Sequence, residues 1–253
     1  SGSVFKAVWD KVEVAWKVFD SEAIDEFLIR DFCQEVTVLS MLSHPNIVRI
    51  MGFILEPKLS VALEFCGGGT LESALRPFEE SKKLDWKLLV KMGLDISRSL
   101  CYLHSRSPAI IHNDLKPDNI MVVDLSPTAP VCLKLIDFGF SIATTNGTRK
   151  DIQSFGSMFE GIISFYCSPD GPSSTVPILP SNEHPETELF LPSIWETIIT
   201  ACHTEYTAER LEYKFSKLWT RIETGPARYL MTTSGHTISS TCHSASMAGL
   251  LNT

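Results

Sequence analysis

Two short polar segments, each flanked by strand-like apolar runs, limit the possible folds of this chain more than any other feature. The first reads IHNDLKPDNI at residues 111–120, and the second reads LIDFG at residues 135–139. Apolar runs on either side favour short strands joined by turns. A compact loop of this kind can point Asp114, Lys116 and Asn119 into one cleft, and the two segments together offer acidic residues and an asparagine as oxygen ligands. Mg²⁺ prefers oxygen ligands of these types, so the sequence predicts a magnesium-binding cleft.

These segments resemble the catalytic loop and the metal-binding turn of protein kinases. The resemblance implies that Asp114 accepts the proton of a substrate hydroxyl and that Lys116 stabilises charge on the transferred phosphoryl group. It also implies that Asn119 and Asp137 hold Mg²⁺ across the phosphates of ATP. Either motif alone could arise by chance. Both motifs in order, with an asparagine five residues after Asp114, make coincidence a poor explanation.

A strand and a helix near the start of the chain resemble the same family. Alternation over residues 12–19 places Ala15 and Lys17 on one face of a strand. The resemblance implies that Ala15 covers the adenine and that Lys17 contacts the phosphates. Glu35, on a helix expected over residues 22–42, resembles the glutamate that pairs with this lysine. Taken alone, each charged residue would be read as an ordinary surface residue.

The other nucleotide contacts follow from the resemblance only. Gly2 and Val4 resemble the end of a Gly-rich loop whose first strand and earlier glycines are missing. Glu64 belongs to a segment that resembles the hinge, whose backbone bonds the adenine edge, and Leu63 then takes the gatekeeper position. Met121 would pack beneath the adenine, although a generic core methionine explains it nearly as well. The predicted nucleotide contacts are Gly2, Val4, Ala15, Lys17, Glu35, Glu64, Cys66 and Met121.

The family also aligns its lobes with a stacked apolar column, for which Leu39, Ile50, His112 and Phe138 occupy the matching positions. All four would be assigned to the core without any family argument. Asp151 resembles a buried aspartate that accepts backbone N–H bonds from the catalytic loop. The resemblance therefore implies that Asp151 fixes the shape of that loop.

The chain departs from the family pattern between Asp137 and Asp151, which are only 14 positions apart. Protein kinases place a longer activation segment here, with an Ala-Pro-Glu motif that helps to form the shelf for a peptide substrate. We expect a shortened segment near residues 141–150. Asn113 replaces the usual arginine of the loop, which argues against control by loop phosphorylation. Arg210 resembles a late arginine whose glutamate partner is absent.

The resemblance implies an α+β, bilobal, protein-kinase-like fold. We expect a small β-rich N-lobe at residues 1–65, without its first strand, and a larger helical C-lobe at residues 66–230. Several prolines at residues 168–192 favour a long loop. Residues 231–253 are rich in Ser and Thr, which predicts a disordered tail.

Composition excludes several classes of partner. The formal net charge is −8 and no Lys/Arg run stands out, which argues against nucleic acid or an anionic membrane surface. No apolar run is long enough to cross a bilayer. The seven cysteines are widely spaced and form no CxxC pair, which disfavours a zinc site or a disulfide framework. We therefore expect a cytoplasmic protein.

The sequence predicts an ATP-dependent serine/threonine protein kinase whose partners are ATP, Mg²⁺ and a protein substrate. The Lys116-Pro117 pair resembles Ser/Thr kinases, and the whole sequence resembles the tyrosine-kinase-like group of these enzymes. A pseudokinase that binds nucleotide as a scaffold is the first alternative, because part of the substrate shelf is missing. A small-molecule kinase on a related fold, such as an aminoglycoside or choline kinase, is the second.

Overall fold

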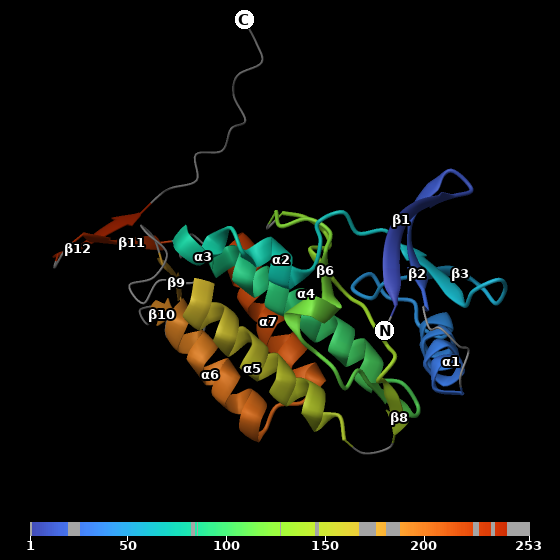
Figure 1. Cartoon of the computed structure of the whole chain (residues 1–253). Coiled ribbons are helices and arrows are strands. Elements are labelled where there is room, and N and C mark those ends of the chain that lie inside the picture. Colours follow the sequence, from blue (N-terminus) through green and yellow to red (C-terminus); the bar gives the residue numbers. More distant parts are fainter. Residues whose placement is uncertain are drawn as a thin grey trace, which may run out of the picture.

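A small antiparallel sheet and a larger group of helices form the two ends of the computed structural model (Figure 1). This arrangement confirms the α+β, two-lobed prediction; the boundary between residues 65 and 66 remains a prediction. None of the helices in the described part of the chain is long and apolar enough to span a bilayer. The structure describes residues 2–19, 26–81, 84, 86–126, 128–144, 147–166, 176–180, 188–224, 228–233 and 236–241.

The N-lobe sheet has the strand order β1-β2-β4-β3, with antiparallel neighbours throughout. Helix α1 lies beside this sheet (Figure 1). Its buried residues include Phe32, Glu35 and Leu39, which recur at three- and four-residue steps and so share one helical face. This face brings Glu35 inward together with the apolar residues. The elements are β1 (Ser3–Trp9), β2 (Val12–Val18), α1 (Glu26–Ser40), β3 (Ile50–Ile54) and β4 (Ser60–Glu64).

A two-residue turn joins β1 to β2. Asp10 and Lys11 have φ values of 48° and 67°, the sign that a type I′ hairpin turn requires at both central positions. Beside the turn, the Trp9 ring lies against Gly52 of β3, where an added Cβ would come within 2.3 Å of the indole. Gly52 therefore lets the tryptophan cover the sheet closely, as no larger residue could.

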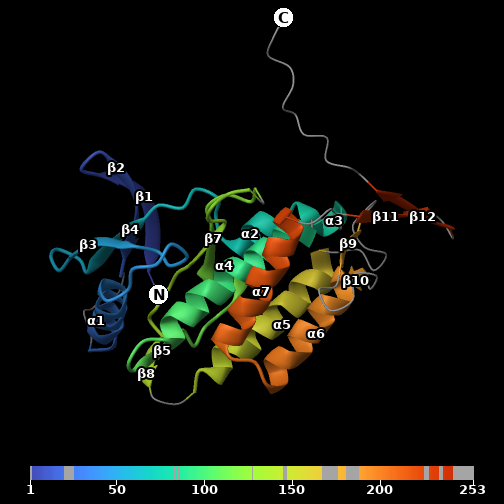
Figure 2. The same cartoon turned by 180° about the vertical axis from the view of Figure 1, so that it is seen from behind.

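The C-lobe is built from helices, with α4 against α7 and α5 against α6 in both views (Figure 2). The Thr70 hydroxyl accepts a hydrogen bond from Ser73 N at 3.2 Å and caps the short helix α2. Between the longer helices the rings of Phe155 and Phe159 lie 4.5 Å apart and that of Trp195 stacks on Phe159 at 5.0 Å. The helices are α2 (Leu71–Leu75), α3 (Phe78–Ser81), α4 (Trp86–His104), α5 (Arg149–Tyr166), α6 (Leu191–Thr204) and α7 (Ala208–Thr224).

Two small ladders carry the polar segments. Strand β5 (Ala109–Ile111) pairs with β8 (Ile142–Thr144), and β6 (Ile120–Val122) pairs with β7 (Leu133–Leu135). The short 3₁₀ turn η1 (Pro117–Asn119) leads directly into β6. Short strands therefore flank both polar segments, as their apolar runs predict.

The structure differs from the sequence-based prediction in the last third of the chain. Strands β9 (Val176–Pro180) and β10 (Glu188–Phe190) lie where we expected a loop, and β11 (Arg228–Thr233) and β12 (His236–Thr241) overlap the expected disordered tail. They form one sheet in the order β10-β9-β11-β12. The β-branched residues of these segments favour strands, a preference that the Pro, Ser and Thr content obscured. The tail residues 242–253 lie outside the described residues.

Candidate active site

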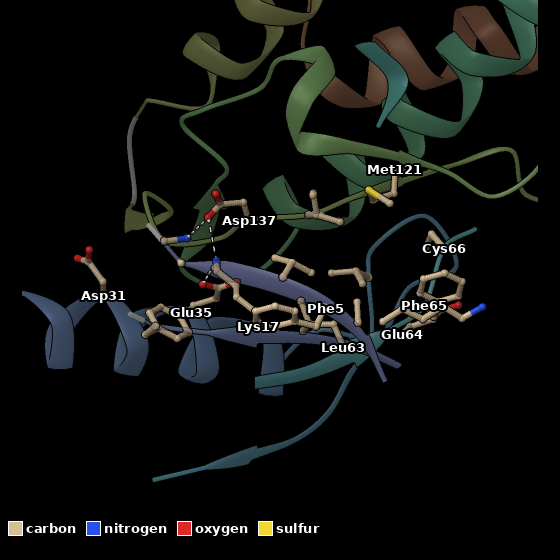
Figure 3. Close-up of a pocket in the computed structure, with 18 of the residues that line it drawn as sticks. Phe5, Lys17, Asp31, Glu35, Leu63, Glu64, Phe65, Cys66, Met121 and Asp137 are labelled. Atoms are coloured by element: carbon tan, nitrogen blue, oxygen red, sulfur yellow. Dashed lines mark hydrogen bonds and ion pairs between the residues drawn. The ribbon is translucent and has the colours of Figure 1, made fainter. Parts of the chain in front are cut away.

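A cavity of about 520 Å³ lies between the N-lobe sheet and the β6–β7 ladder. Figure 3 shows Lys17, Glu35 and Asp137 together at one end of this cavity. Met121 and Cys66 lie at the other end, so the cavity has a charged half and a largely apolar half. All the residues predicted to contact nucleotide line it: Gly2, Val4, Ala15, Lys17, Glu35, Glu64, Cys66 and Met121.

Lys17 is the centre of the charged half. Its Nζ lies 2.5 Å from Glu35 Oε2 and 3.8 Å from Asp137 Oδ1. Strand alternation points Lys17 inward from β2, and the buried face of α1 brings Glu35 to meet it. Burial raises the pKa of the Glu35 carboxyl, while the charge and hydrogen bond of Lys17 oppose that rise. The pair therefore holds a lysine ammonium at a fixed point of the cavity.

Asn119 and Asp137 lie at the same end of the β6–β7 ladder. Ile120 pairs with Leu135, and Ile136 N donates a 3.0 Å hydrogen bond to Asn119 O, so the ladder continues one step beyond the strands. Asp137 follows with φ of 62°, an uncommon backbone conformation for a residue other than glycine. This turn directs the Asp137 side chain into the cavity.

Asp114 forms a compact cluster with Lys116 and Asn119. Its Oδ2 atom accepts hydrogen bonds from Lys116 Nζ at 2.7 Å and from Asn119 Nδ2 at 2.8 Å. The hydrogen bond from Lys116 lowers the pKa of Asp114 and is the largest influence on it. Burial opposes this shift, and the hydrogen bond from Asn119 lowers the pKa further. These three residues do not line the cavity. The cluster lies next to the cavity, because Ile136, which lines the cavity, donates its backbone N–H to Asn119 O.

We call residues 112–119 the catalytic loop. Asp151 of α5 holds the backbone of this loop by hydrogen bonds. Asp151 is fully buried and accepts hydrogen bonds of 2.9 Å from the backbone N–H groups of His112 and Asn113. Its Oδ2 atom also lies 2.9 Å from His104 Nε2. Asn113 has φ of 70°, so the loop turns sharply where Asp151 holds it. This is the geometry that the family resemblance implied for Asp151.

His112 links the catalytic loop to the turn at Asp137. Its ring packs edge-on against Phe138 with 5.0 Å between centroids, and its Nε2 lies 2.9 Å from Ile136 O. Burial lowers the pKa of His112, so the neutral ring donates Nε2–H to that carbonyl. Phe138, His112 and Leu39 are buried as expected, whereas Ile50 is only partly buried against the core.

Some lining residues were not predicted as contacts, and two of them had a signal in the sequence. Phe19 shares the strand face of Lys17, and Asp31 precedes Glu35 by one helical turn. The carboxylate of Glu64, a predicted contact, accepts a hydrogen bond from Lys134 Nζ at 3.0 Å, and the Glu64 backbone N–H donates to Arg49 O at 2.8 Å. The unpredicted lining residues are Phe5, Lys6, Phe19, Asp31, Val48, Phe65, Ile136, Gly139 and Phe140.

The short connection after β8 alters the surroundings of the catalytic loop. Helix α5 begins at Arg149, five positions after β8 ends at Thr144. Asn113, which stands where the family has arginine, donates to Phe140 O at 3.1 Å and accepts from Lys150 Nζ at 2.5 Å. Arg210 forms a 3.7 Å ion pair with Glu205, and both side chains are more than half exposed.

Comparison with known proteins agrees with this geometry. A family model described as the protein kinase domain matches residues 1–169. The chain is 40% identical over 150 residues to the probable serine/threonine-protein kinase drkD of Dictyostelium discoideum, which covers 59% of this chain and 11% of that protein. It is 35% identical over 141 residues to the serine/threonine-protein kinase CTR1 of Arabidopsis thaliana. This match covers 55% of this chain and 17% of that protein.

A longer match extends into the C-terminal half. The probable serine/threonine-protein kinase gdt2 of Dictyostelium discoideum is 27% identical over 245 residues, covering 85% of this chain and 14% of that protein. The chain thus spans less than a fifth of each of these three relatives. Because the family model matches well over half of the residues, and the site has the arrangement described above, this chain belongs to the protein kinase domain family.

Proposed function

We propose that this domain transfers the γ-phosphoryl group of ATP to serine or threonine hydroxyls of a protein substrate. The observation that carries the proposal is the position of Lys17 Nζ, held between Glu35 and Asp137 in a cavity that adjoins Asp114. Such a site lowers a barrier by positioning the reactants and by electrostatic stabilisation. The relatives named above are serine/threonine-protein kinases, which supports the same reaction class.

In this proposal Asp114 acts on the acceptor hydroxyl. The low pKa of Asp114 keeps its carboxylate ionised at neutral pH, so it can accept a hydrogen bond from the hydroxyl and then its proton. The hydroxyl oxygen forms the new bond to phosphorus as the bond to ADP breaks. Lys116, 2.7 Å from Asp114 Oδ2, supplies positive charge beside the transferred group.

The side chains near Asp137 suit a magnesium ion shared with nucleotide phosphates. Asn119 uses its Nδ2 atom to bond both the backbone and the side chain of Asp114, which leaves the Oδ1 atom for a cation. No group of three or more His, Cys, Asp or Glu side chains suited to a metal occurs within the described residues. A two-ligand site fits Mg²⁺, which binds through one or two protein groups together with substrate phosphates. Bound there, the ion would neutralise phosphate charge.

The apolar half of the cavity suits an adenine ring. Val4 and Ala15 line the cavity from the N-lobe sheet and Met121 lines it from the β6–β7 ladder, so a flat ring could be enclosed by apolar contacts from both sides. Glu64 and Cys66 also line the cavity, and in this proposal backbone groups of this segment bond the ring edge. We also propose a cytoplasmic location, where ATP is available and thiols such as the buried Cys66 remain reduced.

A transfer assay tests the proposal. The chain is incubated with Mg²⁺, ATP labelled at the γ-position and a mixture of Ser/Thr peptides, with Asp114→Asn as the matched control. We expect the unmodified chain to transfer the phosphoryl group and Asp114→Asn to lose most of this transfer. Asp114→Asn should still bind Mg·ATP, as measured by thermal shift. Asparagine is nearly the same size as aspartate but cannot accept the proton.

Equal transfer by both proteins would overturn the role of Asp114. Binding of Mg·ATP with no transfer in either protein would overturn the kinase proposal and favour a nucleotide-binding scaffold. The short stretch between Asp137 and Asp151 is the feature that motivates this second outcome.

A further inference from the structure

A second hollow, of about 570 Å³, lies beside the catalytic loop and runs along α5. We call it the α5 groove. Its α5 residues recur at steps of three and four, so one face of the helix forms a wall of the groove. Catalytic-loop residues and one residue of α6 form the rest. The lining residues are Leu115, Lys116, Pro117, Lys150, Gln153, Ser154, Ser157, Met158 and His203.

The α5 groove carries the positive charge of Lys150. Lys116 also lines it but is paired with Asp114 at 2.7 Å, and no aspartate or glutamate is among the described residues that form the groove. Within the described residues, Lys150 Nζ bonds the neutral Asn113 Oδ1 at 2.5 Å, so no carboxylate partner cancels its charge there. Arg149, its neighbour, donates to the carbonyl oxygens of His203 and Thr204 at 3.1 and 2.9 Å. Two successive cations at the start of α5 thus bond neutral acceptors.

The α5 groove begins at the proposed acceptor site. Lys150 bonds Asn113, and Asn113 directly precedes Asp114 in the chain. Lys116 belongs to the groove and to the Asp114 cluster at once. An extended peptide advances about 3.3–3.6 Å per residue. A substrate whose hydroxyl meets Asp114 would therefore place its next few residues in the groove.

We propose that the α5 groove binds an acidic segment of a protein substrate, next to the serine or threonine that is phosphorylated. This proposal rests on the proposed function and names its substrate class. Lys150 gives a charge-assisted hydrogen bond to an anionic side chain at the cost of its bond to the neutral Asn113 amide. Gln153, Ser154 and Ser157 supply uncharged hydrogen-bonding groups along the substrate backbone. Carboxylates and phosphate esters share the required chemistry.

Peptide binding and peptide phosphorylation test the proposal together on the full chain. Short fluorescent peptides carry one serine next to glutamate, glutamine or phosphoserine residues. In one set of peptides these residues precede the serine, and in a second set they follow it. Fluorescence anisotropy in the presence of a non-hydrolysable Mg·ATP analogue reports binding. Initial rates of transfer report KM and kcat.

The variants isolate Lys150. Lys150→Gln keeps an N–H donor for Asn113 but removes the charge, Lys150→Arg keeps the charge, and Lys214→Gln on the exposed surface of α7 removes a charge elsewhere. We expect Lys150→Gln to weaken binding of the acidic peptides and raise their KM by about three- to tenfold. Glutamine peptides, kcat and the affinity for ATP should be unchanged, and Lys150→Arg should retain the preference. Added salt should reduce the difference.

The outcomes separate this proposal from the proposed function. Equal binding of glutamate, glutamine and phosphoserine peptides to the unmodified chain would overturn the acidic substrate class, whatever the transfer rates show. An acidic preference that Lys150→Gln leaves intact would overturn the role of the α5 groove. Selective binding of acidic peptides without transfer would support the groove and overturn the kinase reaction instead. A preference for phosphoserine over glutamate would identify the anion as a phosphate.

Discussion

The ammonium of Lys17 lies 2.5 Å from Glu35 Oε2, although Glu35 is almost fully buried and its second oxygen, Oε1, has no hydrogen-bond partner among the described residues. A structural ion pair would normally satisfy both oxygens of a buried carboxylate. Here Lys17 also reaches towards Asp137, at 3.8 Å, and faces the cavity. Because one oxygen of Glu35 has no partner in the described part of the chain and Lys17 faces the cavity, the arrangement is better suited to binding a phosphate through Lys17 than to a purely structural ion pair with Glu35.

Lys17→Met should weaken binding of Mg·ATP by at least about tenfold, because a charge-assisted hydrogen bond to a phosphate contributes roughly 1.5–3 kcal/mol. Thermal shift at increasing Mg·ATP measures the effect. Lys6→Met is a matched control, because Lys6 also lines the cavity but pairs with Glu13 at 2.7 Å and is half exposed. An equal loss of nucleotide stabilisation in both variants would contradict the assigned phosphate contact.

His112→Phe should make the free energy of unfolding less dependent on pH. Burial lowers the pKa of His112 in the fold, although the charges of Asp151, Asp137 and Asp114 oppose this. The stabilisation from the neutral ring is therefore complete above the unfolded pKa of about 6.5 and is lost as pH falls through the lower folded value. At pH 7.5 the variant should be less stable by about 1–3 kcal/mol, because Ile136 O loses its donor.

Urea unfolding at several pH values between 7.5 and 5 checks this prediction. The difference between the two proteins should shrink as the pH falls, and other titrating groups such as His44 cancel in the comparison. A constant difference across this range would show that His112 does not change protonation between the folded and unfolded states.

Sequence reasoning selected residues that line the cavity because some of its signals are local. Alternation places Lys17 on the inward face of β2, whereas Glu35, which lies on the buried face of α1, was assigned from the family resemblance. The β6–β7 hairpin brings Asn119 and Asp137 to one end without any long-range information. The family resemblance then supplied the roles that the spacing leaves open.

What sequence reasoning missed depends on contacts between distant segments. The bond of Lys150 to Asn113 joins residues 37 positions apart, and no periodicity links them. Phe140 enters the cavity only because of the turn after Asp137. The pairing of β9 with β11 was missed because α6 and α7 separate these two strands in sequence, so no local hairpin signal connects them. Long-range pairing of this kind leaves little local trace.

Lys11→Gly should stabilise the fold. Lys11 has φ of 67° in the turn between β1 and β2, a conformation that costs a residue with a Cβ atom about 1 kcal/mol or more. Glycine removes this cost but loses more entropy on folding. We expect a net gain of about 0.5–1 kcal/mol, measured by urea unfolding. Lys11→Ala is the control, because it removes the same side chain but retains the Cβ atom; a similar gain in Lys11→Ala would contradict the argument from backbone conformation.

Lys91→Met should destabilise the C-lobe by about 3–5 kcal/mol, because it leaves a buried carboxylate without its counter-charge. Lys91 Nζ lies 2.6 Å from Asp95 Oδ1, and both side chains are almost fully buried. The other oxygen of Asp95 accepts hydrogen bonds from Cys132 N at 2.7 Å and Leu133 N at 3.1 Å, at the start of the β7 strand that leads to Asp137. The ion pair therefore supports the strand that positions a proposed metal ligand.

Lys87→Met is the matched control for Lys91→Met. Lys87 lies one helical turn earlier on α4, and the ammonium groups of both lysines lie over the Trp219 ring, at 5.6 and 5.9 Å from its centroid. Losing that cation–π contact should cost no more than about 1 kcal/mol. Urea unfolding gives both values, and Mg·ATP binding shows whether the loss reaches the site. Equal destabilisation in the two variants would mean that the buried pair with Asp95 contributes no more than the contacts that Lys87 makes.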